Sequence, residues 1–158
     1  MAGNDKQFML RAIELAREGV DKDQGGPFGC VIAKDGRIVG EGCNQVTSTN
    51  DPTAHAEIVA IREACRTLGS FQLDGCTVYT SCEPCPMCLG AIYWARAAGI
   101  FYAGTRDDAA AAGFDDKHIY SELEKPKDQR ELEMLNLLRE EAQKVFQHWN
   151  EKPDKTEY

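Results

Sequence analysis

Two short stretches decide the fold and the chemistry of this chain: Thr53-Ala54-His55-Ala56-Glu57 and Ser81-Cys82-Glu83-Pro84-Cys85-Pro86-Met87-Cys88. The first contains a histidine followed two positions later by a glutamate, and the second contains two cysteines three positions apart beside prolines. A catalytic zinc ion takes three protein ligands and leaves one position open, and one imidazole with two thiolates supplies such a set. We therefore expect His55, Cys85 and Cys88 to bind zinc.

The cysteine motif predicts the start of a helix. Residues at i and i+3 project from one face of a helical turn, so Cys85 and Cys88 can bind one metal ion if a helix begins there. Pro84 and Pro86 suit a first turn, where a missing amide hydrogen costs nothing. A helix N-terminus also lowers the pKa of a cysteine, which favours the thiolate that the metal requires.

Glu57 points to hydrolytic chemistry. It follows His55 by about 200 degrees around a helix, so the two side chains can share a site only near the helix end. This places Glu57 beside a water on the zinc, whose pKa the metal lowers to about 7. A carboxylate there can take the proton and pass it to a ring nitrogen and a departing amine. The pattern His-x-Glu followed by Pro-Cys-x-x-Cys is the signature of zinc-dependent nucleobase deaminases, and our hypothesis is hydrolytic deamination.

A closed structural zinc site is the alternative, and it would make the chain a zinc-stabilised interaction module. The sequence has seven cysteines, and Cys82 could be a fourth ligand because it stands three positions before Cys85. A structural site has no use for Glu57, however, so we expect Cys82 to be a packed residue at a strand end. Metal removal separates the two possibilities, since it unfolds a domain that depends on a structural site.

Composition indicates one ordinary globular domain over residues 1–158, large enough to bury roughly two thirds of its unfolded surface. No apolar run approaches the roughly 18 residues of a membrane-spanning helix. The apolar residues of the first 25 positions are interleaved with charges, unlike those of a signal peptide. We expect a cytoplasmic protein without a membrane partner, in which Cys30, Cys43, Cys65 and Cys76 are free thiols.

The net charge of −8 bears on partners. Binding to a nucleic-acid backbone requires clustered lysines and arginines, and this sequence has no basic stripe. We therefore expect no nucleic-acid partner, which argues against a transfer-RNA substrate.

Strands and helices alternate along most of the chain, which predicts parallel pairing with right-handed crossovers. Both motif helices then lie on one face of the sheet, with their N-termini together at the carboxyl ends of the strands, where ligands bind. Asn44, directly after a strand, is a candidate ligand contact or a turn-forming side chain. Before the cysteine motif, the expected elements are a helix from Asn4 or Asp5 to Gly19, strands over 28–33 and 37–43 joined through Lys34-Asp35-Gly36, an irregular stretch over 44–51, a helix capped by Asp51 and ended by Gly69, and a strand over 76–80. After the motif helix, we expect a strand over 100–104, a short helix capped by Asp107 and a loop at 114–116. The last elements expected are a hinge at 125–128, a strand over 132–138 and a helix over 140–149.

Three stretches, at 50–57, 81–96 and 112–116, resemble the bacterial guanine deaminases of the cytidine deaminase-like fold. The resemblance extends over nearly the whole chain, including the final Glu157-Tyr158, and is weakest over 131–156. It implies an α/β fold, a three-layer α/β/α sandwich around a mixed five-stranded sheet. It also implies one zinc ion per subunit and the conversion of guanine and water to xanthine and ammonia.

The resemblance further implies a homodimer that exchanges its C-terminal segments, about residues 126–158, and a small purine as substrate. It assigns catalytic roles to Glu57 and Asp116. A flat purine needs an apolar slot with a few directed polar groups, which suits the implied contacts. These are hydrogen bonds between the purine and Asn44 and Asp116, stacking by Phe28, the main-chain amide of Ala56 near the reacting carbon, a wall at Trp94, and a lid formed by Tyr158 of the other chain.

Two related activities compete with this interpretation. A guanosine deaminase uses the same motif, but a closed Tyr158 lid leaves little room for ribose. A transfer-RNA adenosine deaminase also uses the motif, and the acidic composition argues against it.

Overall fold

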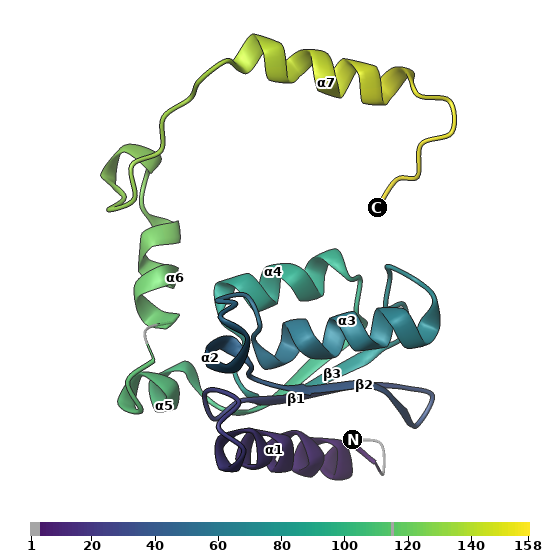
Figure 1. Cartoon of the computed structure of the whole chain (residues 1–158), viewed down its shortest axis with the longest axis vertical. Coiled ribbons are helices and arrows are strands. Elements are labelled where there is room, and N and C mark those ends of the chain that lie inside the picture. The colour runs from purple at the N-terminus through teal and green to yellow at the C-terminus, as the bar shows by residue number, and fades with distance from the viewer. Residues whose placement is uncertain (1–3, 115) are drawn as a thin grey trace. The chain divides into compact units, whose positions relative to one another are not determined.

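The structure is a computed structural model that describes residues 4–114 and 116–158. The chain forms two compact units, Met1–Lys117 and His118–Tyr158. The first unit contains the sheet and the cysteine motif (Figure 1). Its elements are α1 (Asp5–Asp21), β1 (Gly29–Lys34), β2 (Arg37–Cys43), α2 (Val46–Thr49), α3 (Ala56–Leu68), β3 (Thr77–Cys82), α4 (Pro86–Trp94), β4 (Gly99–Gly104) and α5 (Arg106–Ala111).

The described residues form one mixed sheet of four strands in the order β2-β1-β3-β4. Strand β1 runs antiparallel to both β2 and β3, whereas β3 and β4 are parallel. The mixed sheet is confirmed, and the expected parallel pairing holds only for β3 with β4. The hairpin between β1 and β2 is also confirmed, because Asp35 and Gly36 both adopt the positive φ of a two-residue turn, 49° and 76°.

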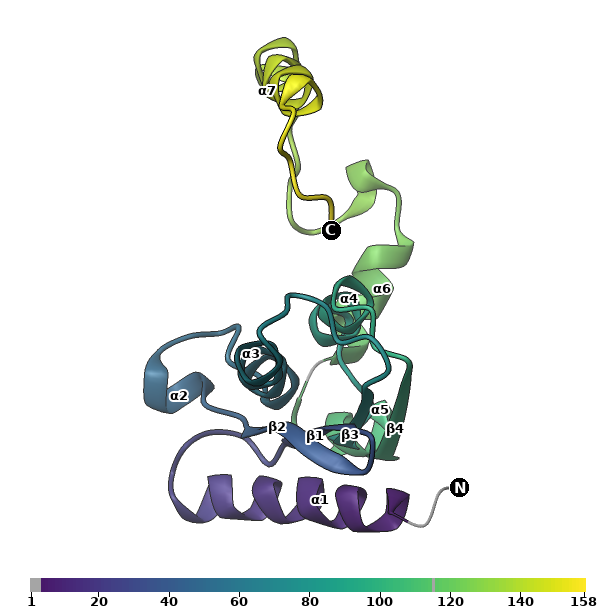
Figure 2. The same cartoon turned by 90° about the vertical axis from the view of Figure 1, so that its right-hand side faces the viewer.

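The two faces of the sheet are covered by different helices (Figures 1 and 2). Helix α1 packs Phe8, Ala12 and Leu15 against one face, while α3 and α4 pack against the other. Helix α3 approaches β2 so closely at Gly40 that a Cβ atom there would lie 2.5 Å from the Ala60 carbonyl oxygen. The expected placement of both motif helices on one face is therefore confirmed.

Three local expectations were wrong. Helix α3 begins at Ala56 rather than at Pro52, because Asp51 turns the preceding loop by accepting from the main-chain amide and hydroxyl of Thr53 at 2.8 and 2.7 Å. The stretch expected to be irregular contains the single turn of α2. Helix α5 is capped by Thr105 rather than Asp107, in a capping box with Asp108.

Helix α6 (Asp116–Glu124) was not anticipated, and its first residue was expected in a loop. A 3-10 turn over Lys127–Gln129 overlaps the hinge expected at 125–128, and α7 (Arg139–Glu151) confirms the last expected helix. No helix among the described residues is long and apolar enough to cross a bilayer.

The expected fifth strand is not formed by the described residues of this chain. Residues 133–138 have no strand or helix assignment, and Leu135 and Leu137 are 80% and 83% exposed. A strand needs a neighbour that shares its main-chain hydrogen bonds, and this segment has none here. Strand β4 is one edge of the sheet, with Phe101 and Tyr102 exposed.

Candidate metal centre

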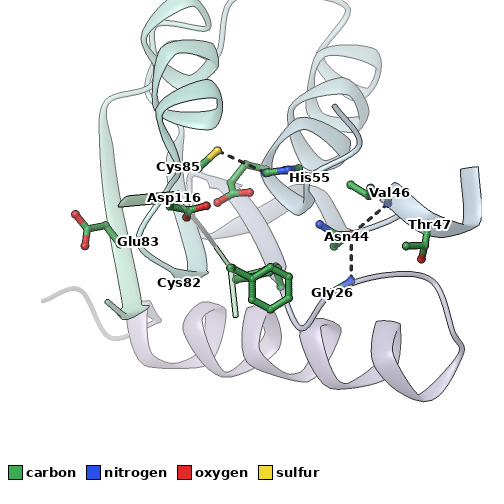
Figure 3. Close-up of a pocket in the computed structure, with 12 residues that line it drawn as sticks. Gly26, Asn44, Val46, Thr47, His55, Cys82, Glu83, Cys85 and Asp116 are labelled. Carbon is green, nitrogen blue, oxygen red and sulfur yellow. Dashed lines mark hydrogen bonds between the residues drawn. The ribbon is translucent and has the colours of Figure 1, made fainter. Parts of the chain in front are cut away.

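Three side chains from the two motifs meet at one point. The Nδ1 atom of His55 lies 3.5 Å from Sγ of Cys85 (Figure 3). The same atom lies 3.5 Å from Sγ of Cys88. All three ligand atoms lie within 4.8 Å of one another, and both cysteines are buried. The expected convergence of His55, Cys85 and Cys88 is therefore observed.

The spacing of these atoms fits zinc. Zinc bonds of about 2.3 Å to sulfur and about 2.0 Å to nitrogen, at a tetrahedral angle, place sulfur and nitrogen about 3.5 Å apart. The structure shows 3.5 Å for both sulfur–nitrogen pairs. One imidazole and two thiolates are also ligand types that zinc prefers. His55, Cys85 and Cys88 thus form a candidate zinc site.

The ligands are positioned by the beginnings of two helices. His55 is the residue before α3 and has extended backbone angles, so its side chain leaves the helix axis. Cys85 has the same role before α4, and its sulfur accepts a hydrogen bond from the Cys88 main-chain amide at 3.5 Å. Pro86 is the first residue of α4, where proline is tolerated. The predicted helix start at the cysteine motif is confirmed.

The cysteine pair favours one thiolate even without a metal. A hydrogen bond from the Cys88 thiol, with a further contribution from His55, lowers the pKa of Cys85 to about 4. Donation to Cys85 and burial together raise the pKa of Cys88. The two sulfurs therefore share one proton, which a metal ion would displace on binding.

Glu57 lies beside the three ligands in the first turn of α3. Its side chain is 6% exposed, and Oε1 accepts a hydrogen bond from the Thr80 hydroxyl at 3.0 Å. Burial raises the pKa of Glu57, while hydrogen bonds that include those with Cys88 and Thr80 oppose that shift. A buried carboxyl group with a raised pKa is suited to accept and release a proton near neutral pH.

Cys82 does not join the ligand cluster found among the described residues. It ends β3, is buried, and donates its thiol hydrogen to the Thr105 carbonyl oxygen at 3.4 Å. Burial, and next the charge of Asp116, raise its pKa to about 11. Its expected position as a packed residue at a strand end is confirmed, and this favours an open site over a closed four-ligand one.

A pocket of about 210 Å³ opens onto these groups. It is smaller than the roughly 300–1,000 Å³ of typical sites for drug-sized ligands, which favours a molecule the size of a single base. The pocket lies at the carboxyl ends of β2 and β3, as expected. It is lined by Gly26, Phe28, Asn44, Val46, Thr47, His55, Glu57, Cys82, Glu83, Cys85, Phe114 and Asp116.

Asn44 is held in one orientation. Its Oδ1 atom accepts hydrogen bonds from the main-chain amides of Gly26 and Val46 at 3.2 and 3.1 Å (Figure 3). With that oxygen occupied by two donors, the amide nitrogen is the group that remains for a ligand. Asn44 is also buried, and it therefore combines the two roles that the sequence left open, turn formation and a place in the pocket.

An aromatic pair closes one part of the pocket. Phe28 and Phe114 meet edge to face, with ring centroids 4.8 Å apart and an interplanar angle of 79°. Asp116 follows two residues after Phe114, and its charge acts on both Cys82 and His55, consistent with its place in the lining. Phe28 and Asp116 were expected in the pocket and are found there.

The remaining expected contacts, Ala56, Trp94 and Tyr158, are not among the described residues that line the pocket. Ala56 is fully buried between His55 and Glu57, and its side chain is part of the core cluster rather than of the pocket lining. Trp94 ends α4, is 63% exposed, and is not among the described residues that line the pocket. Tyr158 belongs to the second unit and is exposed.

Several lining residues were not anticipated. Val46 and Thr47 follow the candidate contact Asn44, and Phe114 precedes Asp116, so closeness in sequence was the available signal. Glu83 stands inside the cysteine motif but binds Arg106, whose Nε and Nη2 atoms donate at 3.1 and 2.6 Å. No local pattern distinguishes such an ion pair from a solvated carboxylate.

Comparison with known proteins adds independent information. Residues 2–104 match the family described as the cytidine and deoxycytidylate deaminase zinc-binding region. The chain is 56% identical to a guanine deaminase of Bacillus subtilis over 155 residues, 98% of this chain and 99% of that protein. An X-ray structure of guanine deaminase from the same organism superposes with a TM-score of 0.94, covering 97% of this chain and 98% of that one. A tRNA-specific adenosine deaminase of Agrobacterium fabrum is 41% identical over 105 residues, 66% of this chain and 68% of that protein.

Proposed function

Since this chain belongs to the family that shares the cytidine and deoxycytidylate deaminase zinc-binding region, we infer that it is a guanine deaminase. The reaction is hydrolytic: guanine and water give xanthine and ammonia. A carbon–oxygen bond forms at the ring carbon that bears the amino group, and the carbon–nitrogen bond to that group breaks. The observation that carries this function is the buried carboxylate of Glu57 beside His55, Cys85 and Cys88 at a pocket of single-base size.

The residues have distinct roles in this reaction. His55, Cys85 and Cys88 would hold a zinc ion, which would supply Lewis-acid chemistry and lower the pKa of water toward 7. Glu57 accepts the proton of the attacking water and passes it to the ring nitrogen and the departing amine. Asp116, which lines the same pocket, assists proton transfer. Glu57 is buried, so its charge interacts more strongly with neighbouring groups than it would in solvent.

The pocket lining supports the proposed substrate contacts of Asn44, Phe28 and Asp116. Asn44 offers its amide nitrogen as a donor to an acceptor atom of the purine, because its oxygen is occupied by Gly26 and Val46. Phe28 stacks on the ring, and Asp116 accepts hydrogen bonds from the purine. The main-chain amide of Ala56 lies next to Glu57 and contacts the ring near the reacting carbon. A pocket that leaves donors or acceptors unpaired with the wrong base discriminates strongly against it.

The rival substrates are a nucleoside and a transfer RNA. The match to the tRNA-specific enzyme covers two thirds of this chain, whereas the match to guanine deaminase includes its C-terminal part. The net charge of −8 also disfavours an RNA backbone. We expect no nucleic-acid partner, and we place the protein in the cytoplasm because the cysteines outside the candidate metal site, Cys30, Cys43, Cys65, Cys76 and Cys82, are free thiols.

The test is ammonia release from guanine, guanosine, cytosine, cytidine, adenine and adenosine by the zinc-loaded protein. We expect guanine to give the highest kcat/KM by at least 100-fold over guanosine and adenine, with xanthine formed in amounts equal to ammonia. A higher kcat/KM for guanosine or adenosine than for guanine would show that the substrate is a nucleoside rather than guanine.

We also propose that the protein is a homodimer that exchanges residues 126–158, so that a three-layer sandwich with a fifth strand is completed by the partner. Two features support this. Strand β4 is a sheet edge with exposed aromatic side chains, and an unpaired edge of this kind is a template for another strand. The segment after the hinge also exposes a series of large apolar side chains, which soluble monomers rarely leave uncovered: Leu132, Met134, Leu135, Leu137, Leu138, Val145 and Phe146.

In this dimer, Tyr158 at the end of one chain forms a lid over the partner's pocket. Trp94 forms an outer wall of the pocket. Deleting Thr156 to Tyr158 should lower kcat/KM for guanine at least tenfold while zinc content and dimer mass stay unchanged. The matched control is Tyr158→Phe, which keeps the ring but removes the hydroxyl group. Steady-state kinetics and light scattering measure the outcome, and unchanged kinetics after the deletion would show that the lid assignment is wrong.

A further inference from the structure

Thr80 is a polar residue in a position that suits an apolar one. Side chains alternate along β3, and Val78 packs with α3 and α4 while Tyr79 packs with α1. Thr80 therefore points toward the face that carries the metal site. It is 1% exposed, and valine has nearly the same shape. Packing alone does not explain the hydroxyl group.

The hydroxyl group contacts the proton carrier directly. Among the described residues, the buried polar or charged side chains are Asn44, Glu57 and Thr80. Two of them line the pocket, and the third, Thr80, does not line it but donates to Oε1 of Glu57 at 3.0 Å. A glutamate side chain has three rotatable bonds, so a fixed donor at one oxygen restricts where the carboxylate can lie. Strand β3 is rigidly held between β1 and β4, which gives that donor a fixed position.

We propose that Thr80 is a positioning residue for catalysis, which holds the Glu57 carboxylate in the orientation required for proton transfer. This rests on the proposed function, because it assigns Glu57 the role of proton carrier. Thr80 is not among the described residues that line the pocket or form the ligand cluster, and it acts through Glu57. The effect of losing it should therefore fall on kcat rather than on substrate affinity.

Thr80→Val removes the hydroxyl group at nearly constant shape, and Thr80→Ser keeps the hydroxyl group but removes the methyl group. For Thr80→Val we expect kcat to fall roughly 10- to 100-fold, the effect of losing a hydrogen bond to a charged group, with KM within about threefold of the parent value. Thr80→Ser should stay within about threefold of the parent in kcat. Thr80→Ala provides a second hydroxyl-free variant, for which the same loss is expected.

Zinc content and thermal unfolding accompany the kinetics, which use whichever base of the panel the parent deaminates fastest. If the parent protein does not deaminate guanine, the proposed function is wrong. The ratio of the kcat of the Thr80 variant to that of the parent tests the role of Thr80 independently. In the Glu57→Gln background, Thr80→Val should cause no further loss. The proposal is overturned if Thr80→Val keeps parental kcat, if Thr80→Ser loses as much as Thr80→Val, or if Thr80→Val loses zinc.

Discussion

Glu57→Gln is expected to lower kcat for guanine by at least about 100-fold, since general acid–base catalysis by a positioned side chain contributes roughly 10²–10⁴-fold. Glutamine has nearly the same shape and can still pair with the Thr80 hydroxyl, but it cannot carry a proton. Because Glu57 is not a member of the ligand cluster, zinc content should equal that of the parent. Timed assays of ammonia release measure kcat, and metal analysis of the purified variant measures its zinc content.

The control for this variant is Glu63→Gln. Glu63 lies on the same helix, and its carboxylate accepts the Glu41 main-chain amide at 2.7 Å, outside the pocket. Its substitution should leave kcat within about threefold of the parent, because glutamine keeps an oxygen that can accept the Glu41 amide and the side chain lies outside the pocket. Residual turnover of Glu57→Gln within tenfold of the parent would show that another group carries the proton.

Metal removal is expected to abolish turnover while leaving the protein folded. A chelator takes the Lewis acid away from His55, Cys85 and Cys88, so activity should fall below detection and return when zinc is restored. A domain of this size buries enough surface to fold without a metal. Apolar side chains, including Ile32, Leu73 and Val78, form the core cluster on the α3 and α4 face, and we expect this core to remain when the metal is removed.

Circular dichroism and thermal melting check the second half of this prediction. The melting temperature should fall on chelation, because a ligand that binds only the folded state stabilises it by mass action. The far-ultraviolet spectrum at room temperature should stay native. Loss of that spectrum on chelation would instead support the structural zinc site.

The sequence was sufficient to predict the metal site because its information is local. The spacing of Cys85 and Cys88 and the prolines beside them encode a helix start, and the structure has a helix that begins at Pro86. His55 was assigned correctly to the site, but the start of its helix was not. Asp51 and Pro52 form a cap signal of their own, and the structure uses Asp51 to turn the loop instead.

The strand over 132–138 illustrates a different kind of error. Its apolar residues satisfy the pattern of a strand, but pairing depends on a neighbour, and the sequence does not specify which chain supplies it. The pocket lining was incompletely predicted for a similar reason. Phe114 reaches Phe28 from 86 positions away, and no periodicity encodes a contact of that kind.

Zinc-edge X-ray absorption on the zinc-loaded protein, with no substrate present, distinguishes an open catalytic zinc site from a closed structural one. We expect two sulfur ligands at about 2.3 Å and two lighter ligands at about 2.0 Å, one imidazole and one water. The Cys82→Ala variant should give the same spectrum, since the Cys82 thiol donates a hydrogen bond to the Thr105 carbonyl oxygen. A third sulfur in the parent spectrum that disappears in Cys82→Ala would contradict an open catalytic site, and with it the assignment of Glu57 as proton carrier.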